Sequence, residues 1–352
     1  MALRALLIGT SGAEWALSPG GQTDTVTPVS VQLSPQSRWG VANIPPILIG
    51  TSVLFVDGST RKVRDLLYSL EKDGYDGSDL TILAQHLFDS TGIKEWCYQQ
   101  HPDSILWTVL KDGSLAGLTY QKEHQVSGWH RHDTEGLFES VAAIQTSEGE
   151  TEVYFVVQRT IGGAAVRYIE RLHSRDFETS EDAFFVDSGL TYDGAPATEI
   201  SGLGHLEGEA VSVLADGNVV DGLTVASGKI TLPNASSLVH VGLPYTSDLE
   251  TLNLEYPTRT GTVQDKMRQV TSIIARLQDT RACLAGPDSG RLTEVKFRST
   301  EDYDEATRLF SGDKEIFMRP GELREGRVFI RVSDPLPITV AAIIARMDHG
   351  EK

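Results

Sequence analysis

Short apolar segments, separated by turns rich in glycine and aspartate, follow one another along most of this chain. The sequence contains 33 glycines, and turn signals recur at intervals of roughly 8–12 residues. That spacing is typical of proteins built from short antiparallel strands, whereas long apolar stripes with a helical period are scarce. The pattern therefore predicts an all-β protein.

The clearest pattern lies between residues 104 and 145. The segments "SILWTVL", "LAGLTYQKE", "QVSGWHRH" and "LFESVAAIQ" are predicted as four successive strands of one unit, with turns at 112–113 and 134–136. The next two segments, "VYFVVQRT" and "AVRYIERLH", flank the glycine pair at 162–163 and predict a hairpin. Successive antiparallel meanders of this kind indicate the blades of a β-propeller or the wall of a barrel.

The first hundred residues show the same pattern less clearly. We expect "RALLIGT" and "EWALS" to pair around Ser11 and Gly12, and "PILIG", "VLFVDG" and "KVRDLLYSLE" to continue the series. One or two helical turns are expected in "SDLTILAQHLF", where Ser78 or Asp79 could cap the helix. Four apolar residues would share one face of it: Leu80, Leu83, Ala84 and Leu87.

Composition changes near residue 176 and again near residue 245, so we expect three parts. Residues 1–175 would form a propeller-like β platform, residues 176–245 an inserted small β-barrel or sandwich, and residues 246–352 a C-terminal β region that packs back on the platform. One element stays ambiguous at 263–279. The segment "VTSII" is β-branched and typical of a strand, but the apolar residues also fit a helical stripe, which would consist of Val263, Met267, Val270, Ile274 and Leu277. Two strand-like runs near the end are separated by Pro335 and Pro337.

Charge and composition narrow the functional classes. The chain has 352 residues and a formal net charge of −18, which disfavours tight binding to a phosphate backbone but not the passage of DNA nearby. No apolar run approaches the roughly 20 residues that span a bilayer, so no membrane association is expected. Cys97 and Cys283 are far apart and form no CxxC motif, which fits a reducing compartment.

The stretch "VSGWHRHDTEG" at 126–136 contains the strongest candidates for chemistry. Alternation along a strand puts His130 and His132 on one face and Trp129 on the other, so the two imidazoles could both reach one ion. A metal site needs further ligands, and neither His124 nor Asp133 is well placed to supply one from the same strand. We expect Trp129 to pack in the core and the histidines to contact neighbouring strands; metal binding or a pH-sensitive contact stays a minor alternative.

A second candidate is the acidic loop "EKDGYDGSD". Asp73 and Asp76 could hold calcium, but the spacing differs from that of an EF-hand and a solvated turn is the default expectation. No G-x-S-x-G, P-loop or dinucleotide-binding motif occurs. The sequence therefore predicts no catalytic residue, no cofactor and no resident metal.

Several long phrases resemble one protein family. The segments "VLFVDGSTRKVRDLLYSLEKDGYDGSDLTILAQHLF", "WCYQQHPDSILWTVLKDGSLAGLTYQKEHQVSGWHRHDTEGLFESVA" and "VYFVVQRTIGGAAVRYIERL" resemble the nozzle, or tail hub, proteins of short-tailed bacteriophages. The likeness is dense from Arg4 to Leu172 and continues more loosely through "GLPYTSDLETLNLE" to "DPLPITVAAI". The region before Tyr245 also resembles, more faintly, a small β module of ubiquitin-activating enzymes, which implies a fold only.

The resemblance implies a structural virion protein. Members of the nozzle family form a homohexameric ring in the virion tail, below the adaptor and portal and in contact with fibres or spikes. DNA leaves through the lumen of this ring without specific binding. Assembly would take place in the cytoplasm of the host bacterium. Family members are usually much longer, with β structure ahead of the segment that aligns with Met1, so this chain is expected to be a piece of such a protein, half of a split gene, or a short variant.

Two other functional classes remain open at this point. A propeller-type glycan-binding protein or polysaccharide depolymerase would need, for catalysis, paired carboxylates about 5–9 Å apart at opposed strand ends. A free-standing adhesion module would expose some of its five tryptophans, which suit a core equally well. Of the three classes, we expect the structural tail protein, which is not an enzyme.

Overall fold

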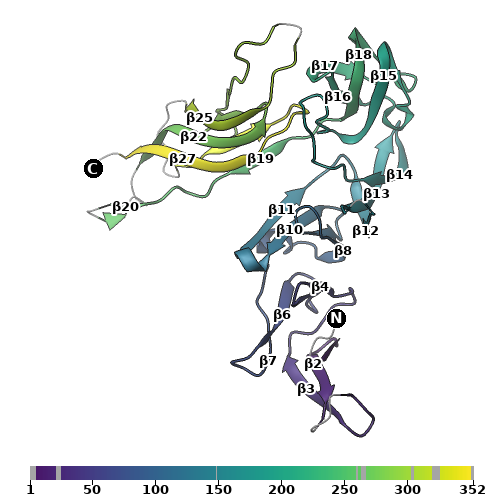
Figure 1. Ribbon diagram of the computed structural model, residues 1–352, viewed down its shortest axis with the longest axis vertical. Coiled ribbons are helices and arrows are strands. Elements are labelled where there is room, and N and C mark those ends of the chain that lie inside the picture. The colour runs from purple at the N-terminus through teal and green to yellow at the C-terminus, as the bar shows by residue number, and fades with distance from the viewer. Residues whose placement is uncertain are drawn as a thin grey trace. The chain divides into compact units, whose positions relative to one another are not determined.

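The computed structural model describes residues 5–20, 25–147, 149–258, 261–262, 267–302, 305–318 and 326–349. Strands make up 56% of the structure and helix 3%, and the sheets are antiparallel (Figure 1). The prediction of an all-β protein is therefore confirmed. In the described part of the chain no helix has the length and hydrophobicity needed to cross a membrane.

The chain divides into two compact units. Unit 1 comprises residues 1–160 and 164–172, and unit 2 comprises residues 161–163 and 173–352. The small β domain and the C-terminal region both belong to unit 2. Apolar side chains from both parts pack together there, among them Leu214, Leu336 and Ala183.

Unit 1 consists of small sheets that follow each other along the chain. The first sheet has the order β1-β2-β3, the second β4-β5-β6-β7, the third β11-β10-β9-β8 and the fourth β12-β13-β14. The bounds are β1 (Leu6–Gly9), β2 (Glu14–Pro19), β3 (Val31–Ser37), β4 (Ile47–Ile49), β5 (Ser52–Val56), β6 (Val63–Ser69), β7 (Gly74–Asp76), β8 (Ile93–Gln99), β9 (Ile105–Leu110), β10 (Leu115–Gln121), β11 (Val126–His132), β12 (Leu137–Gln145), β13 (Thr151–Ile161) and β14 (Ala164–Arg171).

The strand over 137–145 corrects the predicted four-stranded unit. It was expected beside the histidine strand, but β12 pairs with β13, and β8 completes the third sheet instead. The reason is packing between two sheets. Apolar side chains of β9 and β10 meet those of β12 and β13 in one buried cluster, whose largest members are Trp107 and Phe155. Strand β11 is thus an edge strand.

The expected helical turns near residue 80 are only partly present. The segment contains turns and a single 3₁₀ turn, η1 (Gln85–Leu87); two others are η2 (Lys122–His124) and η3 (Gly204–Leu206). Neither Ser78 nor Asp79 caps a helix, because η1 begins after Ala84 and has no side-chain cap. The Asp79 Oδ1 instead accepts from the Thr81 backbone N–H at 2.9 Å and stabilises the turn there. Ala84 is buried in the core, but Leu83 is 93% exposed, because the chain does not complete the α-helix that would turn it inward.

The small β domain of unit 2 has one sheet of order β15-β18-β16-β17. Its bounds are β15 (Asp187–Ser201), β16 (Ala210–Ala215), β17 (Asn218–Thr224) and β18 (Lys229–Leu243). Among the described residues none of the sheets closes into a barrel, so the predicted small barrel is an open sheet. Irregular register along β15 and β18 marks bulges, which bend these two long strands.

The C-terminal region contributes two larger sheets, of order β19-β26-β23-β24 and β25-β22-β27, and the short pair β20-β21. The ambiguous element is a strand from residue 268 onward, because β25 and β27 pair with both of its edges; Val263 lies outside the described residues. The bounds are β19 (Ser247–Glu250), β20 (Pro257–Thr258), β21 (Gly261–Thr262), β22 (Arg268–Thr280), β23 (Leu284–Gly286), β24 (Thr293–Glu294), β25 (Phe310–Phe317), β26 (Phe329–Val332) and β27 (Val340–His349).

Candidate functional site

The two histidines of β11 form a bonded pair. His130 Nδ1 lies 2.6 Å from His132 Nε2, and the two ring centroids are 4.9 Å apart. Both rings are half-buried on the same face of the third sheet, and Trp129 lies on the opposite face with its Nε1 donating to the Leu80 carbonyl at 2.8 Å. The predicted division of this strand into a histidine face and a tryptophan face is confirmed.

The histidine pair packs against Trp107 because the position between them on the sheet is a glycine, Gly117. Trp107 on β9 and His130 on β11 both lie opposite Gly117 of β10, so the three positions form one row across the sheet. A Cβ at Gly117 would lie only 2.1 Å from His130 Cε1. Its absence lets the imidazole rings lie against the indole, whose centroid is 5.9 Å from His130 and 4.9 Å from His132.

This cluster has two imidazoles and no third metal ligand among the described side chains. No group of three or more His, Cys, Asp or Glu residues in the described ranges is placed to hold a metal ion. His124 lies exposed in η2, and Asp133 is exposed directly after the end of β11. The geometry shows two histidines packed against Trp107, so they contact a neighbouring strand as expected.

The acidic loop at 71–79 brings its carboxylates to separate partners. Asp73 accepts from the Tyr68 hydroxyl at 2.6 Å, whereas Asp76 pairs with Lys72 at 2.5 Å. The hydrogen bond from Lys72 lowers the pKa of Asp76, which therefore stays charged at neutral pH. Calcium binding by Asp73 and Asp76 stays a prediction, and the described contacts are those of a solvated turn.

A buried charge network that the sequence reading missed lies around Asp65 of β6. Its Oδ2 accepts from Lys122 Nζ at 2.6 Å and from the Tyr120 hydroxyl at 3.1 Å, and its Oδ1 accepts from the Ser78 backbone N–H at 2.8 Å. Burial by itself would raise the pKa of Asp65, but the bonds from Lys122 and Ser78 bring it below its ordinary value. The sequence did contain a signal for this network, because Asp65 lies between the apolar residues Val63 and Leu66 at an inward-facing position of the strand.

The same network places a lysine beside a serine, but not as a catalytic dyad. Lys122 Nζ lies 3.2 Å from Ser52 Oγ, and a lysine acts as general base only when it is neutral. Burial would lower the pKa of Lys122, but Asp65 raises it above the ordinary value, so the ammonium is retained. Ser52 is also only 1% exposed. The arrangement therefore ties the second sheet to the third and activates no nucleophile.

Neither cysteine has the environment of a reactive thiol. Cys97 is half-buried beside the cluster that contains Trp107, and Cys283 is buried in the core of the C-terminal region. Burial raises the pKa of each thiol to about 12, so the thiolate is not formed at neutral pH. Both cysteines therefore pack as small apolar side chains.

Comparisons with known proteins add little to this geometry. No protein family profile matches the chain, and no curated protein sequence matches it. Among solved structures, a chain in the complex of S. cerevisiae Dbp5 with Nup159, Gle1, IP6 and ADP is similar over 68% of this chain and 73% of that chain, at 13% identity and a TM-score of 0.27. At that TM-score the likeness carries no argument about fold or function.

Proposed function

We propose that this chain is a structural protein of a bacteriophage tail, which assembles with further copies into the nozzle ring that retains and releases DNA. It would contact the tail adaptor and portal on one side and fibres or spikes on the other. The protein performs no catalysis in this role. The proposal starts from the resemblance of residues 4–172 to tail nozzle proteins and is supported by three features of the described structure.

The order of the strands in unit 1 is the observation that carries the proposal. Its four sheets are each built from strands that are neighbours in sequence, and the sheets follow one another along the chain. Radially repeated β architectures such as propellers are built in this way. A platform of this kind offers many short edges and loops for contacts with other subunits.

Two buried charged groups of unit 1, Asp65 and Arg159, are committed to internal contacts. Besides the Asp65 network, the fully buried Arg159 donates from Nε and Nη2 to the two carboxylate oxygens of Glu170, both at 2.6 Å. Such bidentate pairs fix strands relative to each other. This supports a scaffold in preference to a site whose polar groups await a substrate.

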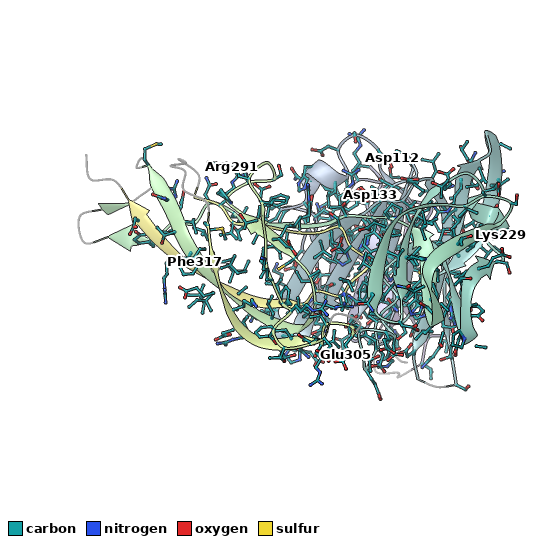
Figure 2. The ribbon with its side chains drawn as sticks, turned by 90° about the horizontal axis from the view of Figure 1, so that it is seen from above. Asp112, Asp133, Lys229, Arg291, Glu305 and Phe317 are labelled. Atoms are coloured by element: carbon teal, nitrogen blue, oxygen red, sulfur yellow. The ribbon has the colours of Figure 1, made fainter. Side chains whose placement is uncertain are left out.

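Exposed apolar side chains on strands support assembly. Ile169 on β14 is 78% exposed and Phe317 on β25 is 72% exposed, and Phe317 projects away from its sheet (Figure 2). Side chains of this size on strands are suited to contacts with other subunits. They are the first positions at which to test assembly.

Charge suits a DNA conduit. Six copies at −18 each would carry about −108, and an acidic lumen offers DNA no counterion-releasing contacts. DNA could then slide through without adhering. An assembled ring with a basic lumen would contradict this part of the proposal.

Light scattering after size exclusion, followed by negative-stain imaging, tests the ring directly. The chain is measured alone and with a tail adaptor complex, because rings can close only on their neighbours. We expect six-membered rings in at least one of the two samples. Absence of rings in both, or hydrolysis of host surface polysaccharide by the purified chain, would overturn the proposal.

A further inference from the structure

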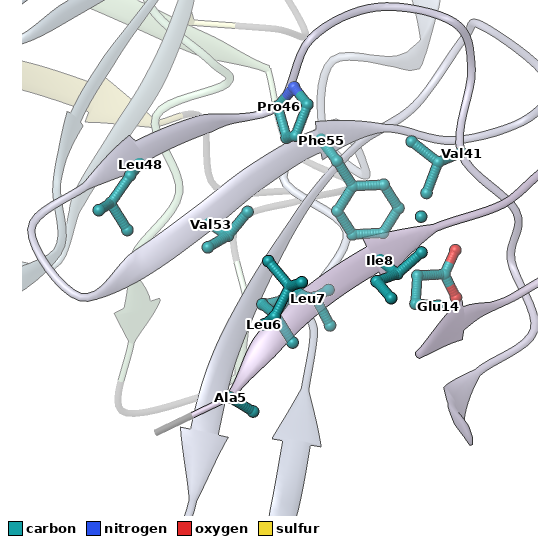
Figure 3. A pocket seen from close by; sticks show the side chains of 12 residues that line it. Ala5, Leu6, Leu7, Ile8, Glu14, Val41, Pro46, Leu48, Val53 and Phe55 are labelled. Carbon is teal, nitrogen blue, oxygen red and sulfur yellow. The ribbon is translucent and has the colours of Figure 1, made fainter. Parts of the chain in front are cut away.

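An apolar pocket of about 440 Å³ lies in unit 1 between β1 and the β4–β5 hairpin (Figure 3). Its volume is in the range of protein sites that bind ligands or short peptide segments. Eleven of the twelve lining residues carry no charge: Ala5, Leu6, Leu7, Ile8, Gly9, Val41, Pro46, Leu48, Val53, Phe55 and Leu66. The twelfth is Glu14.

Glu14 is a buried carboxylate with an unused acceptor. The residue is 3% exposed, and its Oε2 accepts from the Ser37 hydroxyl and from the Trp39 backbone N–H at 3.3 Å. Its Oε1 is buried and has no hydrogen-bond partner among the described residues. Figure 3 shows this carboxylate beside Ile8 and Val41 at one end of the pocket. Leaving such an oxygen unsatisfied is costly, so a donor that entered the pocket would be bound strongly.

The pocket also runs along a free strand edge. All four residues of β1 line it, although successive side chains of a strand point to opposite faces, so the pocket follows the edge and not one face. Strand β1 is the outer strand of its sheet and pairs only with β2 among the described residues. Its outward N–H and C=O groups can therefore pair with an added strand.

From these three features we propose that the pocket is a docking site for an extended segment of another protein, with aliphatic side chains and one lysine or arginine. The segment adds to the edge of β1, its aliphatic side chains fill the space over Phe55 and Leu66, and its basic group donates to Glu14 Oε1. Leu6 and Leu48, which are 62% and 40% exposed at the rim, become covered.

Charge complementarity selects this occupant. A buried carboxylate prefers a cationic donor, since charge-assisted hydrogen bonds are about twice as strong as neutral ones. The chain itself carries −18, so it attracts basic partners over long range. The site does not depend on the proposed tail function, and a failure of ring assembly would leave it intact.

The test uses an array of synthetic seven-residue peptides with valine, isoleucine or leucine at alternate positions. One intervening position carries lysine, arginine, glutamine or glutamate, and the best binder is then measured in solution by fluorescence anisotropy. We expect the basic peptides to bind at least about tenfold more tightly than their glutamine counterparts. Methylating the peptide amides that face β1 should abolish binding, because it removes the strand pairing.

Three variants of the full chain locate the binding. Glu14→Gln keeps an oxygen for Ser37 and Trp39 but should lose the preference for lysine over glutamine. Leu48→Asp should abolish binding, whereas Ile169→Asp, an equally polar change on the exposed face of β14, should not alter it. Thermal melting confirms folding in each case, and if Glu14→Gln does not fold, Leu6→Asp takes its place as a second rim variant.

Several outcomes would overturn the proposal. They are an array with no binder, a lysine preference that survives in folded Glu14→Gln, or binding that survives Leu48→Asp. Self-association of the chain that Leu48→Asp abolishes would assign the pocket to a second copy and reject the basic partner.

Discussion

The third sheet of unit 1 and the sheet of the small β domain in unit 2 each have four antiparallel strands and contain histidines held by hydrogen bonds, but they are built differently. The third sheet has the order β11-β10-β9-β8, so every strand pairs with its sequence neighbour. The small domain has the order β15-β18-β16-β17, in which the first strand pairs with the last. Local hairpins thus specify one sheet, and a long-range pairing specifies the other.

The histidines of the two sheets differ in the same way, since one set is held by local contacts and the other by long-range contacts. His130 and His132 are two residues apart and bond to each other. His240 is held by groups 49 and 59 residues away: its Nδ1 lies 2.9 Å from Thr191 Oγ1, and its Nε2 lies 3.0 Å from the Glu181 carbonyl. Because a carbonyl only accepts, Nε2 carries the proton and Nδ1 accepts from the hydroxyl. The comparison teaches that a histidine in a β-sheet can be fixed by its own strand or by the whole domain.

Removing the Asp65 carboxylate should have the largest effect on stability, and only unit 1 should be destabilised. Asp65→Ala leaves Lys122 and Tyr120 without their acceptor, and we expect the free energy of unfolding of unit 1 to fall by about 2–4 kcal/mol, less than for a fully buried pair because Lys122 can reach water. Chemical denaturation should then show unit 1 unfolding before unit 2.

Asp76→Ala is the matched control, since it breaks an exposed pair with Lys72 and should change stability far less than Asp65→Ala does. Equal losses in the two variants would contradict the assigned role of Asp65. The pH dependence gives a second check. Because the pKa of Asp65 is lowered in the folded state, its contribution is present above the ordinary aspartate value and is lost as the pH falls below it.

A methyl group at position 117 should disturb the His130–His132 pair and cause an intermediate loss of stability. In Gly117→Ala the Cβ meets the His130 ring, and we expect a loss of about 1–3 kcal/mol from overpacking. Gly128→Ala on the adjacent strand is the control, because nothing lies within 4 Å of its Cβ position. In a His130→Ala background the cost of Gly117→Ala should largely vanish. A cost that persists there would place the strain elsewhere.

Titration of His240 should give the smallest effect, in unit 2. Burial lowers the pKa of His240, so the unfolded chain binds more protons than the folded one just below the ordinary histidine value. Stability of unit 2 should therefore be complete above about pH 6.5 and fall as the pH drops below it, by at most about 1.4 kcal/mol per pH unit. Melting curves at pH 7.5 and 5.5 measure this change.

The variant His240→Gln should have a weaker dependence in that pH range, because its amide can donate to the Glu181 carbonyl without titrating. His86→Gln, at an exposed position in unit 1, serves as the control and should keep the dependence of unit 2. If His240→Gln retains the full dependence, another group is responsible.

Local pattern alone predicted much of the molecule. Alternation of apolar and polar residues identified most strands of residues 104–171 and put Trp129 opposite His130 and His132, because the side-chain period of a strand is fixed by its backbone. Glycine pairs and Asp-Gly turns marked hairpins for the same local reason. The absence of catalytic motifs could also be read directly from the sequence.

Partner choice, in contrast, was decided by the tertiary structure. The sequence did not reveal that β12 leaves the histidine sheet, that β15 pairs with β18, or that residues 268–280 form a central strand. Nor did it indicate that Asp65 meets Lys122, 57 residues away, or that Glu14 borders an apolar pocket. A strand's period belongs to its own backbone, but its neighbours are set by which distant surfaces bury each other and satisfy their hydrogen bonds.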